Sequence, residues 1–132
     1  MATIFSRIIR GEIPCYKIAE NERFFAFLDI NPLTEGHTIV VPKTETDYIF
    51  NLDDEELGQM MVFAKKVAAD IEKAIPCKRI AVAVIGLEVP HAHIHLVPIT
   101  QEGDLDFKKE HLKLTNEQFL EIQRRITSSR NN

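Results

Sequence analysis

The chain has few cysteines, no tryptophan, no long apolar run and no excess of positive charge. Its 132 residues include only Cys15 and Cys77, too few for a disulfide framework and without a CxxC pair. No apolar run approaches the ~18 residues that a membrane-spanning helix needs, and the first residues lack a signal-peptide pattern. Acidic residues number 20 against 16 Lys and Arg, a formal net charge of -4 that argues against nucleic-acid binding by bulk charge. We therefore expect a protein of the reducing cytoplasm without a membrane segment.

The composition is that of one globular domain over residues 1–132, with 45% hydrophobic and 27% charged residues. Amphipathic spacing predicts helices over 3–10, 53–75 and 115–129. Strand-favouring segments predict strands over 15–20, 23–29, 37–42, 79–86 and 91–99. The nearly continuous apolar run over 79–86 indicates a central strand covered on both faces. Residues 101–110 are polar and predict a surface loop, and the whole pattern favours an α+β domain.

The most unusual segment is Pro90-His-Ala-His-Ile-His-Leu-Val-Pro98, which holds three of the five histidines. In a strand, alternate residues face the same side. His91, His93 and His95 would therefore project from one face, while the apolar residues between them enter the core.

Three interpretations of these histidines remain open from the residues alone. They could be solvated side chains, or they could bind zinc, copper or nickel, for which neutral imidazole is a common ligand. However, consecutive positions on one strand face rarely reach a single ion, and only Glu88 lies nearby as a further ligand. The third interpretation is phosphoryl chemistry, because neutral imidazole can attack phosphorus while its neighbours stabilise charge. We favour this third interpretation.

The segment 91–97 resembles the signature of the histidine triad (HIT) family of nucleotide hydrolases and transferases, His-φ-His-φ-His-φ-φ with φ apolar. Three further blocks, over residues 4–14, 26–32 and 36–43, resemble upstream segments of that family and come in the same order. The resemblance implies a HIT-like α+β fold with a five-stranded, mainly antiparallel sheet and helices packed on it. It also implies a homodimer in which the two sheets join, and it leaves residues 101–132 without a motif.

The resemblance further implies catalytic roles for four histidines. His93 aligns with the nucleophile that becomes nucleotidylated at the α-phosphorus of a purine nucleotide. His91 and His95 align with its flanking partners, and His37 aligns with a fourth histidine near the phosphate.

Binding residues are likewise implied by the resemblance. Asp29 aligns with the carboxylate that accepts hydrogen bonds from the ribose hydroxyls, although from the residues alone it could equally form an Asx-turn with Asn31. The positions that line the base pocket correspond to Phe5, Ile8, Ile13, Phe27 and Ile30.

The chain departs from the family pattern at two places. Many members carry amide, hydroxyl and glycine residues before the triad, whereas residues 84–90 here contain one glycine, Gly86, and the negative Glu88. This difference puts leaving-group assistance in question. Ser6 stands where some members have a zinc-binding cysteine, so we predict no structural zinc and no required cofactor.

The leading hypothesis is a nucleotide hydrolase or nucleotidyl transferase that acts through a nucleotidyl-His93 intermediate. Its substrates would be purine nucleotide conjugates, such as AMP phosphoramidates, acyl nucleotides or dinucleoside polyphosphates. The alternatives are a purine-nucleotide-binding module with little turnover and an imidazole-rich metal-binding protein. His111 receives no role.

Overall fold

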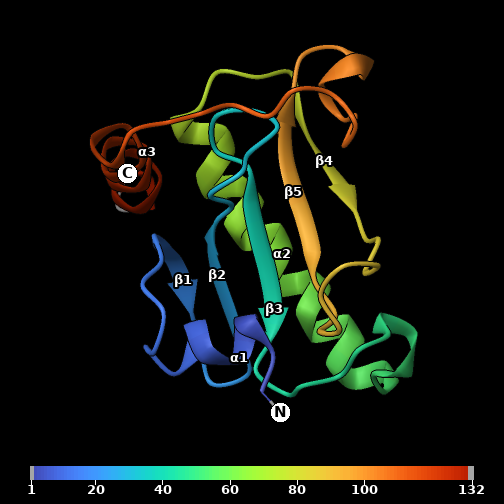
Figure 1. Cartoon of the computed structure of the whole chain (residues 1–132). Coiled ribbons are helices and arrows are strands. Elements are labelled where there is room, and N and C mark those ends of the chain that lie inside the picture. The colour runs from blue at the N-terminus through green and yellow to red at the C-terminus, as the bar shows by residue number, and fades with distance from the viewer. Residues whose placement is uncertain (1, 131–132) are drawn as a thin grey trace.

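Five strands form one antiparallel sheet in the order β1-β2-β3-β5-β4 in the computed structural model, which describes residues 2–130 (Figure 1). The strands are β1 (Lys17–Glu20), β2 (Phe24–Leu28), β3 (Thr38–Pro42), β4 (Arg79–Ala83) and β5 (Ile94–Ile99). The helices are α1 (Ile4–Ile9), α2 (Asp54–Ala74) and α3 (Asn116–Ser129), with 3₁₀ turns η1 (Ile49–Asn51) and η2 (Glu102–Asp104). Among residues 2–130, no helix combines the length and the apolar character that crossing a membrane requires. The predicted α+β class is confirmed.

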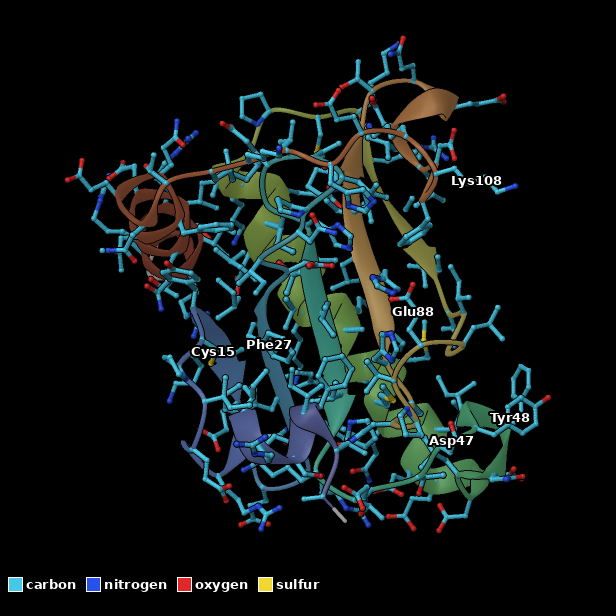
Figure 2. All side chains as sticks on the ribbon, in the orientation of Figure 1. Cys15, Phe27, Asp47, Tyr48, Glu88 and Lys108 are labelled. Carbon is cyan, nitrogen blue, oxygen red and sulfur yellow. The ribbon has the colours of Figure 1, made fainter. Side chains whose placement is uncertain are left out.

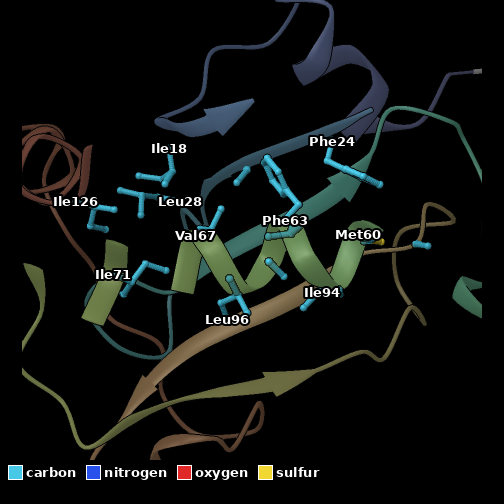
Figure 3. Close-up of a cluster of buried hydrophobic side chains, with 14 of the residues drawn as sticks. Ile18, Phe24, Leu28, Met60, Phe63, Val67, Ile71, Ile94, Leu96 and Ile126 are labelled. Carbon is cyan, nitrogen blue, oxygen red and sulfur yellow. The ribbon is translucent and has the colours of Figure 1, made fainter. Parts of the chain in front are cut away.

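The long helix α2 packs on one face of the sheet, behind it in the view of Figure 1, and forms the main core with it (Figure 3). Asp53 caps the helix by accepting a hydrogen bond from the Glu56 amide, and acidic residues in the first turn suit the positive end of the helix dipole. Its apolar stripe packs on inward-facing residues of the strands and on α3; the buried stripe is Met60, Phe63, Ala64, Val67 and Ile71. The helix ends before Pro76, which lacks the amide hydrogen needed to continue it.

A second apolar cluster covers the opposite face of β2 and β3. It consists of Phe5 and Ile8 from α1 together with Phe25, Phe27, Ile39 and Val41 from the strands. Because both faces of these strands are covered, every residue of β2 and β3 is buried. His95, the histidine of β5, lies on this second face, since it is paired with Ile39.

The prediction of a central strand over 79–86 is wrong. Strand β4 ends at Ala83 and occupies an edge of the sheet, where Val82 is 50% exposed. The apolar run continues beyond the strand into a loop, in which Leu87 is 88% exposed. An apolar composition indicates that a segment packs against other apolar groups. It does not say whether those groups belong to the core of the same chain.

Two other differences concern β5 and the segment after it. The predicted strand over 91–99 begins only at Ile94, so His91 and His93 precede it in extended backbone. The predicted alternation nevertheless holds, because Ala92, Ile94 and Leu96 enter the main core. The predicted loop over 101–110 contains the short turn η2.

Candidate active site

A cavity of about 420 Å³ opens on the sheet face that carries the second cluster. It lies between α1, the turn after β2, the loop that follows β4, and β5 with the segment beyond it. Its lining comprises Ile4, Phe5, Asp29, Asn31, Ile39, residues 85–89, His93, His95, Phe107 and His111. This volume suits a small-molecule ligand.

His91 is fully buried behind the cavity, and its backbone carbonyl group contacts His93, which lines the cavity. Its ring Nε2 lies 2.8 Å from the Pro42 carbonyl oxygen, which can only accept, so Nε2 carries the proton. Its Nδ1 then accepts from the Thr3 hydroxyl at 2.7 Å. Both ring nitrogens are thus occupied, and the His91 carbonyl group is what meets His93.

His93 lines the cavity with a defined tautomer. Its Nδ1 lies 2.8 Å from the His91 carbonyl oxygen and therefore donates, which leaves the lone pair on Nε2. The Phe5 ring packs edge-on against the imidazole at a centroid distance of 4.9 Å. Burial lowers the pKa of His93, and this outweighs the hydrogen bond to the His91 carbonyl and the charges of Asp29 and Glu88, which raise it. Near neutral pH the ring is therefore uncharged and can act as a nucleophile.

His37 and His95 form a second chain of hydrogen bonds that leads to the cavity. The Leu33 amide donates to His37 Nδ1 at 3.0 Å, so the His37 proton is on Nε2. This Nε2–H donates to His95 Nδ1 at 2.9 Å, and the His95 proton must therefore be on its own Nε2. Burial lowers the pKa of both rings to about 4, which keeps them neutral. The cavity thus receives a lone pair from His93 and an N–H donor from His95.

Asp29 has one oxygen bound locally and a second that faces the histidines. Its Oδ1 accepts from the Asn31 amide at 2.8 Å, which is the Asx interaction that the residues alone permit. Its Oδ2 lies 3.5 Å from His37 Nε2, and the side chain lines the cavity. A carboxylate has acceptor capacity left after one amide bond, so the Asx interaction does not prevent Asp29 from binding ligand hydroxyls.

Asp29, His37 and His95 also offer ligand atoms that lie within 4.8 Å of one another, as a metal site would require. The hydrogen bonds around His37 argue against this use. The Leu33 amide occupies the His37 Nδ1 lone pair, so Nε2 keeps its proton and has no lone pair to give to an ion. The arrangement fits a neutral hydrogen-bond relay better than a metal centre.

The structure brings most of the predicted site residues to one place. His93, His95, Asp29 and Phe5 line the cavity, while His37 and His91 lie buried directly behind it. The other predicted base-pocket residues lie elsewhere: Ile8 and Phe27 in the second cluster, Ile13 against that cluster, and Ile30, 72% exposed, outside the lining.

The loop before the triad closes one side of the cavity. Figure 2 shows Glu88 alongside β5, on the loop that returns from β4. Gly86 has a positive φ of 71°, a conformation that glycine adopts without strain. As the sequence indicates, this side offers a carboxylate and no amide or hydroxyl side chain.

Sequence reasoning missed Phe107 and His111, which both line the cavity. They come from the segment between β5 and α3, which crosses in front of the sheet past the turn between β2 and β3 (Figure 1). Their contribution depends on long-range contacts, and no local pattern in this polar segment signals it.

Comparison with known proteins gives consistent matches. A family model described as HIT domain matches residues 10–102. An uncharacterized HIT-like protein of Borreliella burgdorferi is 35% identical over 132 residues, covering 94% of this chain and 95% of that protein. The adenosine 5'-monophosphoramidase hnt1 of Schizosaccharomyces pombe is 36% identical over 107 residues, 77% of each chain. The solved structure of a hypothetical histidine triad nucleotide-binding protein from Sulfolobus tokodaii matches with a TM-score of 0.85 and 26% identity, covering 97% of this chain and 91% of that one.

Proposed function

Since the chain belongs to the HIT family, we propose that it hydrolyses purine nucleotide conjugates at the α-phosphorus through a nucleotidyl-His93 intermediate. The observation that carries the proposal is the pair of tautomers at the cavity. His93 offers the Nε2 lone pair, and His95 offers an Nε2–H donor. A nucleophile beside a donor for the phosphoryl oxygens is what displacement at phosphorus requires.

In the first step, His93 Nε2 forms a bond to the α-phosphorus and the bond to the leaving group breaks. For a phosphoramidate, the bonding electron pair goes to the nitrogen, which takes a proton from solvent and departs as a neutral amine. The His93 ring becomes positively charged, and the His91 carbonyl oxygen on its Nδ1–H stabilises that charge. The His95 Nε2–H hydrogen-bonds a phosphoryl oxygen and stabilises its negative charge.

In the second step, water attacks the same phosphorus and releases His93. The new phosphorus–oxygen bond forms as the bond to Nε2 breaks, and the electron pair returns to the ring. The water proton goes to solvent, and the products are a nucleoside monophosphate and the amine. An acceptor other than water would make the same chemistry a nucleotidyl transfer.

Asp29 and Phe5 orient the nucleotide in this proposal. The free capacity of the Asp29 carboxylate accepts the ribose hydroxyls, and Phe5 contributes an apolar surface for the base. A phosphoramidate is the leading substrate class, because a relative that matches 77% of this chain is named an adenosine 5'-monophosphoramidase. The proposed mechanism uses no metal, because His93 supplies the nucleophile and His95 supplies the hydrogen-bond donor.

The test is release of AMP from adenosine phosphoramidate in the presence of a chelator. We expect wild type to release AMP and His93→Ala to lose activity by on the order of 10³-fold or more, because the nucleophile is gone. Lys66→Ala, exposed on α2, is the matched control and should behave as wild type. Full activity of His93→Ala would contradict the mechanism.

A nucleotide-binding role with little turnover is the second candidate. It is favoured by Glu88, since a carboxylate at the cavity rim replaces donors that would assist the leaving group. This candidate predicts that calorimetry detects AMP binding to the folded protein while no conjugate tested is cleaved.

A further inference from the structure

The His111 ring bridges two backbone carbonyl groups at the edge of the cavity. Its Nδ1 lies 2.6 Å from the Asn31 oxygen and its Nε2 lies 3.1 Å from the Phe107 oxygen. A carbonyl oxygen can only accept, so both contacts are hydrogen bonds only when both ring nitrogens carry protons. The geometry therefore selects the charged imidazolium form of His111.

The charges around His111 are consistent with this form. Hydrogen bonds to the Asn31 and Phe107 carbonyl groups raise the pKa of His111, and Asp29 raises it further. Lys109 opposes this, but Asp104 lies 3.8 Å from its ammonium group. His37, directly before β3, is the other titratable group that senses His111, and it stays neutral because burial lowers its pKa.

These hydrogen bonds fix Phe107 against the catalytic histidines. The Phe107 ring packs edge-on against His95 at a centroid distance of 4.8 Å and lies 6.2 Å from the His37 ring. The Leu112 amide donates to the Pro32 carbonyl at 2.9 Å, which holds the far end of the same segment. The cavity is thus enclosed by Phe5 beside His93 and by Phe107 beside His95. This second wall lies beyond residues 10–102, where the HIT domain matches.

We propose that Phe107 is a specificity-determining wall of the substrate cavity and that His111 is the positioning residue that holds it in place. The proposal rests on the proposed function, because it concerns which conjugates the cavity admits. An apolar ring beside His95 leaves little room for a long leaving group and gives it no hydrogen-bond donor. Asp29 and Glu88 add negative charge to the lining, while both N–H groups of His111 are used by carbonyl oxygens.

The substrate class that fits such a lining has a compact, neutral or amine leaving group. A polyphosphate chain would meet two carboxylates and a phenyl ring, and the cation in the lining, His111, has both of its N–H groups bound to carbonyl oxygens. Small phosphoramidates are therefore preferred over dinucleoside polyphosphates. Because His111 holds the wall only as an imidazolium, this selection weakens as the pH rises through its pKa.

The activity test compares kcat/KM for adenosine phosphoramidate and for diadenosine tetraphosphate. We expect Phe107→Ala to shift the ratio of the two values by roughly tenfold or more toward the tetraphosphate. His111→Ala should shift the ratio in the same direction, and the double variant should add little, because His111 acts through Phe107. Phe107→Leu keeps an apolar wall and serves as the matched control. An unchanged ratio in Phe107→Ala, or additive shifts in the double variant, would overturn the proposal.

A second measurement needs no turnover and so separates failure of this proposal from failure of the proposed function. Chymotrypsin cleaves after phenylalanine only where the local backbone can open. We expect cleavage after Phe107 to be slow at about pH 6 and faster once the pH exceeds the pKa of His111, which an NMR titration of the ring locates. Phe50, which is 70% exposed, is the internal control for the protease at each pH.

The same measurement on His111→Ala should show fast cleavage after Phe107 at both pH values. An NMR titration of wild type should show both His111 nitrogens protonated at about pH 6. Two results would contradict the positioning role of His111 even in an inactive protein. One is cleavage after Phe107 that does not depend on pH or on His111, and the other is a His111 ring with a single proton at about pH 6.

Discussion

At the residue scale, the proton positions of His37, His93 and His95 follow from two backbone groups. The His91 carbonyl oxygen fixes the proton of His93 on Nδ1, and the Leu33 amide fixes the proton of His37 on Nε2. From these two contacts a lone pair reaches the cavity on His93 and a donor reaches it on His95. Neither role requires a charged ring, and burial lowers the pKa of all three of His37, His93 and His95.

The neutral state of the buried rings predicts that acid destabilises the fold. The pKa of His37 falls from 6.5 to about 4 on folding, so the unfolded chain binds a proton that the native ring does not. The contribution of the neutral His37 ring to the free energy of unfolding is complete above about pH 6.5. It should be lost as the pH is lowered toward 4. His37 alone contributes roughly 2 kcal/mol of this loss by about pH 5, and His95 acts in the same direction.

Urea unfolding at about pH 7 and about pH 5 measures this loss. His37→Gln keeps an amide donor for His95 but does not titrate, so its stability should fall by less over the same interval. Thr38→Ser, at the next position of the chain and also buried, is the matched control and should lose as much as wild type. Equal losses in wild type and His37→Gln would show that His37 is not the group responsible.

The sequence predicted that the four histidines and Asp29 belong to one site, because the triad and each of its upstream blocks consist of consecutive residues. It could not assign their protons, because each tautomer depends on a backbone partner such as Pro42 or Leu33 that no motif contains. Phe107 and His111 were missed for a related reason: His111 binds Asn31 across 80 positions of sequence.

At the element scale, α1 links the N-terminal end of the chain to the triad. Thr3 caps this helix by accepting from the Ser6 amide at 3.1 Å, while its hydroxyl donates to His91. The Thr3 amide and the Ser6 hydroxyl both donate to Glu45 Oε1, at 2.8 Å and 2.7 Å. Ser6 therefore belongs to a hydrogen-bond network at the position where some family members have a zinc-binding cysteine.

The network predicts that Thr3→Val destabilises the protein more than a surface change should. Valine has the shape of threonine but neither caps α1 nor donates to the buried His91 Nδ1. We expect the free energy of unfolding to fall by roughly 1–3 kcal/mol, as measured in urea at neutral pH. Thr3→Ser retains the hydroxyl and is the matched control. A Thr3→Val protein as stable as Thr3→Ser would show that neither hydrogen bond matters.

Helices were predicted better than strand environments because their ends carry local signals. Asp53 and Thr115 both accept hydrogen bonds as caps, close to the predicted helix starts. For β4, the sequence shows only that residues 79–86 are apolar, and the number of neighbouring strands is set by the whole topology. An edge strand and a central strand can therefore have the same composition.

At the scale of the whole molecule, the two edges of the sheet differ. Beside β1 the structure places α3, which contacts that strand, whereas β4 forms the other edge next to an apolar loop. Val82, Val84, Ile85 and Leu87 are all exposed there. An edge strand with unpaired backbone groups and exposed apolar side chains is suited to pairing with another chain.

We therefore expect the chain to form a homodimer through β4, as its resemblance to HIT proteins implies. Val82→Lys places a charge among these apolar residues and should shift the protein toward monomer in size-exclusion chromatography with light scattering. Leu120→Lys makes a similar change on α3, where the side chain is 47% exposed, and should leave the oligomeric state of wild type unchanged. Since Ile85 and Leu87 also line the cavity, loss of the dimer should lower turnover as well as mass. A monomeric wild type would contradict this expectation, and the exposed apolar residues of β4 and the loop after it would then have to serve a different partner.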